Sequence, residues 1–158
     1  MLCEICCPAT ALQAKDEMRI IGLDLGEKRI GVAAADDRTR VAVPVTTVSA
    51  GSDAVAAITK LLEEQQADEV VVGLPLSMTG AMGPQARLTN EVVEALRQRL
   101  TMPVHTMDER LSSAQADRSL QLAGRSRHGR APEGARDAIA AAIVLQAYLD
   151  VHRRSACA

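Results

Sequence analysis

Aromatic residues are nearly absent from this chain of 158 residues, which has no Trp, no Phe and a single Tyr, Tyr148. The hydrophobic core must therefore be built from aliphatic residues and Met. Modules that bind single-stranded nucleic acid by stacking bases on aromatic side chains are disfavoured for the same reason. Because large interfaces are commonly anchored by aromatic residues, we expect a monomer or a small homo-oligomer.

Long apolar runs and a large excess of one charge are also missing. No apolar segment approaches the ~18 residues that a membrane-spanning helix needs, so we expect a soluble protein with no membrane partner. Lys and Arg number 18 against 20 Asp and Glu, a net charge of −2. Contacts with nucleic acid must therefore come from a local basic patch and not from the total charge.

Cysteine occurs only near the two chain ends, at Cys3, Cys6, Cys7 and Cys157. A structural zinc site needs a second ligand pair with its own spacing, so free thiols in a reducing cytoplasm are the simpler interpretation. Glu4 interrupts the short apolar stretch at the N-terminus, which argues against a secretory signal. We expect residues 1–17 to form a loose extension, with Met18 as a candidate for the natural start.

The spacing of apolar residues predicts a three-stranded antiparallel meander followed by alternating helices and strands. Pro44 in the third strand suits an edge position. The predicted fold is an α/β domain over 18–150, with a mixed five-stranded sheet covered by helices, the last two strands being parallel, and a tail over 151–158. The expected segments are strands over 19–25, 29–35 and 41–48, a helix begun by Ser52 or Asp53 and ending near 66, a strand over 69–74, a helix over 88–100, a strand over 103–107, and helices over about 112–122 and 134–150.

Two of these helices carry faces that we expect to be buried. The 88–100 helix should bury its apolar stripe of Leu88, Val92, Leu96 and Leu100. The last helix should bury Ile139, Ile143 and Leu145, and its run of alanines over 140–142 allows a close approach to the sheet.

Asp24 is the most informative single residue, because it interrupts an otherwise apolar strand. A carboxylate in such a place costs several kcal/mol unless its charge is compensated, and a metal ion is one way to compensate it. The alternative is that Asp24 lies at the end of the strand and accepts backbone hydrogen bonds from the turn at Gly26.

Three further acids are candidates for the same site. Asp108 and Glu109 follow a strand, so only one of them should share a face with Asp24, and spacing alone does not choose between them. Asp137 opens the last helix, where a carboxylate commonly serves as a cap or a dipole partner. Three carboxylates without a His and Cys cluster would favour Mg²⁺ or Mn²⁺ over zinc and would suit phosphodiester hydrolysis.

Basic residues surround these acids in the sequence. Lys28 and Arg29 follow Asp24, Arg110 follows Glu109, and further arginines lie over 118–130, among them Arg127 and Arg130. They are candidates for a track along a phosphate backbone, although an ordinary solvated loop would look the same. The loop after Gly73 lacks the Lys-Ser/Thr ending of a P-loop, so we expect bare backbone close to a substrate.

Four segments, in order, resemble the bacterial YqgF family of pre-16S rRNA nucleases, which is related to Holliday junction resolvases. They are Ile20-Gly-Leu-Asp-Leu-Gly-Glu-Lys-Arg-Ile-Gly-Val-Ala33, Val72-Gly-Leu-Pro-Leu76 with Gly80, Asp108-Glu-Arg-Leu-Ser112, and Asp137-Ala-Ile-Ala-Ala141 before Leu145-Gln-Ala-Tyr-Leu149. The resemblance runs from about Met18 to Asp150. The sequence departs from the family pattern at Ser77-Met-Thr79 and in the loop over 124–136.

The resemblance implies an RNase H-like fold in which Asp24, Glu109 and Asp137 are catalytic and bind Mg²⁺ or Mn²⁺, and it selects Glu109 over Asp108. It also implies trimming of the 5′ end of pre-16S rRNA in the cytoplasm, with the small ribosomal subunit precursor as a partner. Two alternatives stay open: resolution of branched DNA by the same residues, and a catalytically weak factor that binds nucleic acid or the ribosome.

Overall fold

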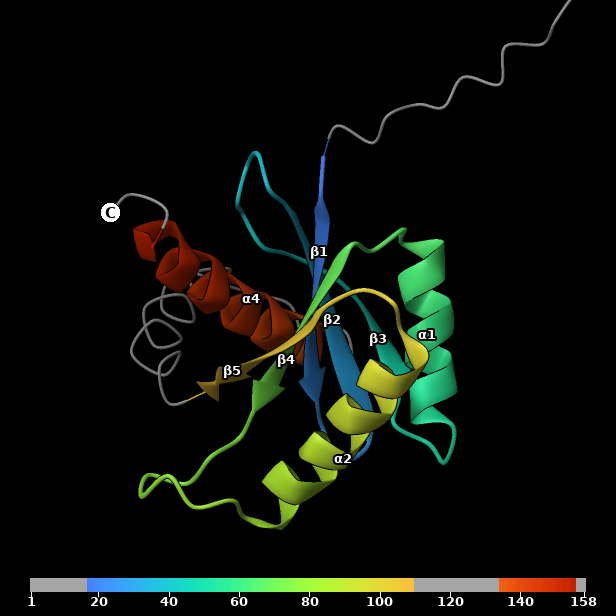
Figure 1. The fold of residues 1–158 in the computed structure, drawn as a ribbon. Coiled ribbons are helices and arrows are strands. Elements are labelled where there is room, and N and C mark those ends of the chain that lie inside the picture. Colours follow the sequence, from blue (N-terminus) through green and yellow to red (C-terminus); the bar gives the residue numbers. More distant parts are fainter. Residues whose placement is uncertain (1–16, 110–133, 156–158) are drawn as a thin grey trace, which may run out of the picture.

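The computed structural model describes residues 17–109 and 134–155, with side chains to His152. Its five strands form one mixed sheet in the order β3-β2-β1-β4-β5 (Figure 1). The first three are antiparallel neighbours, and β4 and β5 join β1 in parallel, which confirms the predicted five-stranded sheet. The strands are β1 (Arg19–Leu25), β2 (Arg29–Asp36), β3 (Val43–Ser49), β4 (Glu69–Leu74) and β5 (Val104–Asp108).

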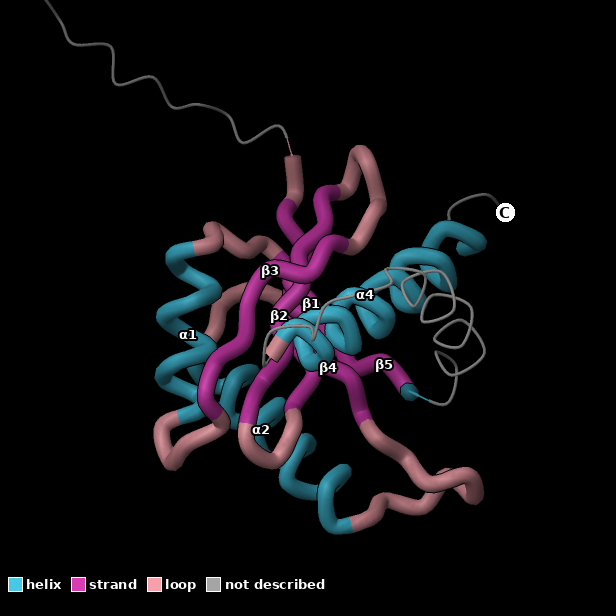
Figure 2. Tube along the Cα trace, turned by 180° about the vertical axis from the view of Figure 1, so that it is seen from behind, coloured by secondary structure: helices cyan, strands magenta, loops and turns pink. Residues whose placement is uncertain are grey.

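Helices cover both faces of this sheet. The two helices α1 (Ala54–Glu64) and α2 (Pro84–Arg99) lie on one face, and α4 (Ala135–Ser155) crosses the other (Figures 1 and 2). The helix predicted over 112–122 lies outside the described residues. Helix α4 continues to Ser155, so five residues of the expected tail are helical. Within 17–109 and 134–155, no helix is long and apolar enough to cross a bilayer.

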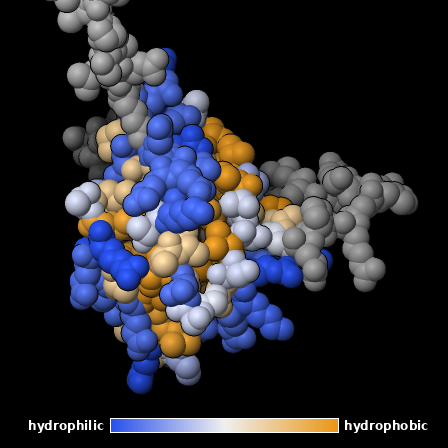
Figure 3. All heavy atoms as spheres, turned by 90° about the vertical axis from the view of Figure 1, so that its right-hand side faces the viewer, coloured by the Kyte–Doolittle hydropathy of each residue, from blue (hydrophilic) through white to orange (hydrophobic). Residues whose placement is uncertain are grey.

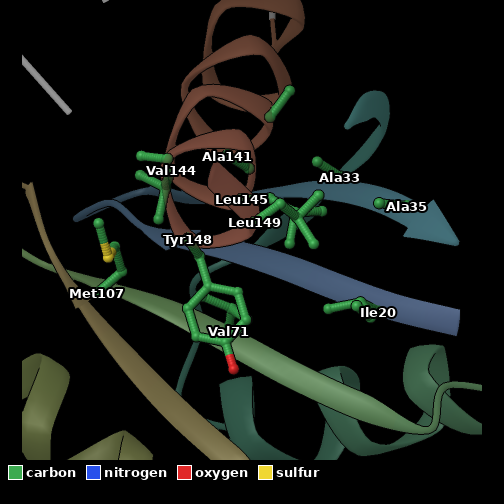
Figure 4. Packing of buried hydrophobic residues seen from close by; sticks show 12 residues of the cluster. Ile20, Ala33, Ala35, Val71, Met107, Ala141, Val144, Leu145, Tyr148 and Leu149 are labelled. Atoms are coloured by element: carbon green, nitrogen blue, oxygen red, sulfur yellow. The ribbon is translucent and has the colours of Figure 1, made fainter. Parts of the chain in front are cut away.

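Each face of the sheet has its own hydrophobic core, because side chains alternate along a strand. In β1, Ile21, Leu23 and Leu25 face α1 and α2, whereas Ile20 faces α4. Figure 4 shows Leu145, Tyr148 and Leu149 extending from α4 toward the sheet. Asp24 has the parity of Ile20, so its side chain belongs to the α4 face.

The apolar stripe of α2 is rotated from the predicted one. Leu96 is buried as predicted, but Leu88 is 57% exposed, because the helix buries the face next to the predicted stripe. Val92 and Leu100 pack only at the margin of the core. The prediction differed because it followed the large apolar residues and passed over Ala86 and Thr89, which are both buried. The buried residues of α2 are Ala86, Thr89, Val93 and Leu96.

The contact face of α4 was also only partly predicted. Leu145 is buried as expected, but Ile139 and Ile143 are half-buried at the flanks of the helix. The line nearest the sheet runs through Ala138 and Ala141. Small side chains on this line allow close approach, which leaves the isoleucines at the sides.

Candidate acidic active site

Asp24 lies near the carboxyl end of β1, between two glycines on the neighbouring strands. In the antiparallel pair with β2 its partner is Gly31. In the parallel pair with β4, Leu23 lies opposite Val72, so the next position places Asp24 beside Gly73. The carboxylate therefore stands on the α4 face with no side chain on either strand neighbour.

Gly31 brings the start of α4 to this point. A Cβ at Gly31 would clash with the backbone carbonyl of Asp137, so only glycine lets the first turn of α4 lie directly on β2. The helix entry also requires glycine, since Gly134 has a φ of +97°. Asp137, half-buried in this turn, consequently lies close enough to Asp24 for their charges to interact.

Gly73 has the same function toward Glu109. A Cβ at Gly73 would lie 2.8 Å from Glu109 Oε1, so the acid side chain extends over the bare backbone of β4. Glu109 follows the end of β5 with the parity of Met107, which belongs to the core under α4. Asp108 has the opposite parity, and the structure thus brings Glu109, and not Asp108, to the face of Asp24.

The two carboxyl groups of Asp24 and Glu109 are coupled. Burial raises the pKa of the Glu109 carboxyl from 4.5 to about 7, and the charge of Asp24 adds to this effect. Burial also raises the pKa of Asp24, as does the nearby Asp137 carboxylate. The protonated Glu109 carboxyl donates a hydrogen bond to Asp24, which favours one proton held by the pair.

This arrangement fits a hard divalent cation. Two adjacent carboxylates that cannot both ionise without cost are neutralised by such an ion, and an all-oxygen donor set suits Mg²⁺ or Mn²⁺. Within the described part of the chain, no three His, Cys, Asp or Glu side chains converge closely enough to hold an ion together. Asp24 and Glu109 are thus the two carboxyl groups in direct contact, and Asp137 interacts with Asp24 through its charge.

The predicted phosphate contacts are only partly described. Lys28 is exposed in the turn that follows β1, and Arg29 opens β2 half-buried, so both stand beside the carboxyl end of β1. Gly73 lies against Glu109, as above. The remaining predicted contacts, Arg110, Arg127 and Arg130, lie outside the described residues.

Gly31 is the site residue that sequence reasoning missed. The signal was present, because a glycine inside an apolar strand marks a close approach of backbone. His105 is not part of this pair: its Nε2 lies 3.5 Å from Glu69 Oε1, and its ring centroid lies 5.6 Å from that of Tyr148.

Comparison with known proteins identifies the family of this chain. The family model described as "RuvX: Holliday junction resolvase" matches residues 18–151. A "Putative pre-16S rRNA nuclease" of Chloroflexus aggregans is 44% identical over 140 residues, covering 87% of this chain and 97% of the relative. One of Anaeromyxobacter dehalogenans is 44% identical over 135 residues, covering 84% and 97%.

Solved structures show the same fold at low sequence identity. Thermus thermophilus RuvC, solved in complex with a Holliday junction substrate, aligns with a TM-score of 0.55 at 16% identity, covering 86% of this chain and 96% of that one. The fowlpox virus resolvase, solved with Holliday junction DNA, aligns with a TM-score of 0.53 at 13% identity, covering 85% and 99%. The sheet and its helices are RNase H-like, as predicted, and the chain belongs to the RuvX family of resolvase-like nucleases.

Proposed function

We propose that this protein is a divalent-metal-dependent endonuclease whose ion is held by Asp24 and Glu109, with Asp137 joining the ligand set once the ion draws the three carboxylates together. The observation that carries the proposal is the coupled pair of carboxyl groups on the α4 face, with bare glycine backbone on both sides of Asp24. Perturbed carboxyl groups that share a proton are typical of catalytic sites.

In this proposal the chain's own residues position the reaction. Asp24 is fixed by the backbone of β1, and the absence of a side chain at Gly73 lets the Glu109 carboxyl lie over β4, on the face of Asp24. Lys28, exposed in the next turn, would bind an adjacent phosphate oxygen as a point charge. Mg²⁺ or Mn²⁺, when bound, supplies an activated water and stabilises the charge that develops on the phosphate.

The descriptions of the relatives support precursor ribosomal RNA as the substrate. Those more than 40% identical are described as pre-16S rRNA nucleases, so we propose trimming of the 5′ end of this RNA, in the cytoplasm and on the small-subunit precursor. Branched DNA is the second candidate, which the description of the family and the resolvase structures favour. A binding factor with little activity is the third.

The test is cleavage of two labelled substrates by the purified full chain: a precursor 16S rRNA fragment and a four-way DNA junction. Each is incubated with Mg²⁺, Mn²⁺ or EDTA. We expect metal-dependent cleavage of the RNA that Asp24→Asn abolishes and Glu63→Gln, an exposed control on α1, retains. Cleavage by Asp24→Asn at the wild-type rate would refute the site, and preference for the junction would reassign the substrate.

A further inference from the structure

The loop over 75–83, which joins β4 to α2, carries the most exposed large apolar side chain of the described residues. Met78, near the middle of this loop, is 92% exposed, and the next highest value in the described part of the chain is the 57% of Leu88. Met82, in the same loop, is also exposed. A single exposed apolar residue is common on protein surfaces, so Met78 is informative only through the way the loop presents it and through what lies nearby. We call this segment the Met78 loop.

Hydrogen bonds hold the tip of the Met78 loop in a closed turn. The Gly80 amide donates to the Ser77 carbonyl at 2.8 Å, and the Ala81 amide donates to the Ser77 hydroxyl at 3.0 Å. Gly80 has a φ of +80°, a conformation that glycine adopts readily. The hydroxyls of Ser77 and Thr79 are hydrogen-bonded to each other at 2.9 Å. The turn therefore fixes the backbone around Met78 and leaves its side chain in solvent.

The Met78 loop also lacks charge. The segment over 70–86 contains no Asp, Glu, Lys, Arg or His. Proteins contact phosphates mainly through Lys and Arg or through free hydrogen-bond donors, and the two hydroxyls at the tip are already bonded to each other. The face of the molecule that carries α1, by comparison, interleaves hydrophilic residues with its exposed apolar ones (Figure 3). The tip of the loop thus suits the flat, uncharged face of a base better than it suits a phosphate backbone.

The loop begins at the end of the sheet that holds the acidic pair. Because β1, β4 and β5 are parallel, their carboxyl ends lie along one edge, and the loop projects beyond it (Figures 1 and 2). Gly73, which lies against Glu109, is five residues before Met78. Five extended residues span at most about 18 Å, so Met78 lies within that distance of Gly73. One strand of a DNA duplex rises about 3.4 Å per nucleotide, so about five nucleotides cover this reach.

We propose that Met78 packs against one base of the strand whose phosphate lies at Asp24, within about five nucleotides of that phosphate, and holds the base unstacked from its neighbour. Apolar side chains, Met among them, separate adjacent bases in proteins that deform nucleic acid. The polarisable thioether of Met also makes favourable contacts with aromatic rings. Tyr148, in a chain without Trp or Phe, is not available for this contact, since it is buried and donates its hydroxyl to Glu69 at the amino end of β4. The inference deepens the proposed function and rests on it for the position of the phosphate.

The direct test is the fluorescence of 2-aminopurine, a base analogue that is quenched while stacked and fluoresces strongly when unstacked. The precursor 16S rRNA fragment and the four-way DNA junction each carry one 2-aminopurine, placed at successive positions in a series of substrates. The full chain is added in EDTA, which prevents metal-dependent cleavage, and binding is followed in parallel by fluorescence anisotropy. We expect the fluorescence to increase at one position or at two adjacent positions. Binding without an increase at any position would overturn the proposal.

Three variants assign the increase to the Met78 side chain. Met78→Gln keeps the length of the side chain but makes its end polar, so it should lose the increase and weaken binding about twofold to tenfold. Met78→Leu stays apolar and should retain the increase. Met18→Gln is the matched control, since it makes the same change at an exposed Met just before the amino end of β1, and it should behave as the wild type. An increase in Met78→Gln equal to that of the wild type would refute the assignment.

Cleavage assays distinguish this inference from the function on which it rests. Met78→Gln should cleave the intact substrate more slowly than the wild type does. An abasic residue at the responsive position leaves no base to hold, so the two proteins should then cleave at similar rates. An increase that depends on Met78 without any cleavage would retain the base contact and refute the nuclease. Metal-dependent cleavage without such an increase would refute the base contact alone.

Discussion

Removing the charge of Glu109 should make the fold more stable at neutral and alkaline pH, because in the wild type this charge is buried beside that of Asp24. In Glu109→Gln the side chain keeps its shape and a donor for Asp24 but carries no charge. The pKa of Glu109 is raised from 4.5 to about 7, so the folded protein binds this proton more tightly than the unfolded chain does. Stability is therefore lost as the pH rises from about 4.5 through about 7, and the variant should not show this loss.

The size of the effect follows from the same pKa. A tenfold change in proton affinity corresponds to about 1.4 kcal/mol, so the full rise would correspond to at most about 3 kcal/mol. Glu109 is only half-buried, and water screens part of this cost. We expect Glu109→Gln to exceed the wild type by about 1 to 2 kcal/mol at pH 8, which raises the melting temperature by roughly 3 to 6 °C.

The assay is urea unfolding, followed by circular dichroism, of the wild type, Glu109→Gln and the exposed control Glu63→Gln between pH 5 and pH 8. The gap between the wild type and Glu109→Gln should be smallest at pH 5 and widest at pH 8. Addition of 10 mM Mg²⁺ should close the gap at pH 8, since a bound ion stabilises the ionised pair, and EDTA should restore it. A gap that is the same at every pH would refute the coupling.

Three further substitutions test the geometry. Gly31→Ala should lower the free energy of unfolding by about 1 to 3 kcal/mol in urea, since its Cβ meets the backbone of Asp137; a stable variant would show that α4 does not need this approach. Gly73→Ala displaces Glu109 and should slow cleavage about 100-fold with an unchanged circular dichroism spectrum, and wild-type rates would contradict the placement. Thr89→Val should raise the free energy of unfolding by about 1 kcal/mol in a thermal melt, whereas a loss would show that the hydroxyl has a partner.

Most of the fold followed from the sequence because periodicity is a local signal. Alternating apolar residues identified the strands, and Pro44 indicated the edge strand that β3 proved to be. The orientation of α2 did not follow from the sequence. The periodicity of Leu88 and its neighbours suggested a buried stripe, but in the packed helix Leu88 faces solvent.

The residues of the candidate site could be proposed from the sequence, but the way in which the fold brings them together could not. Asp24 stood out because a carboxylate in an apolar strand needs an explanation. Spacing alone left Asp108 and Glu109 equal, and the family resemblance selected Glu109. The physical reason for that choice is that Met107 points toward α4, which is a tertiary fact. The function of Gly31 depended on the pairing of β1 with β2 and on the docking of α4, and no local pattern contains both.

The central claim is that Asp24 and Glu109 hold the catalytic ion, and titration of the metal-free protein with Mn²⁺ by calorimetry tests it most directly. We predict saturable binding to the wild type and to Glu63→Gln, and loss of that binding in Asp24→Asn and in Glu109→Gln. Unfolding measurements on the same samples ensure that each variant is folded. Binding of Mn²⁺ to folded Asp24→Asn with the affinity of the wild type would contradict the claim.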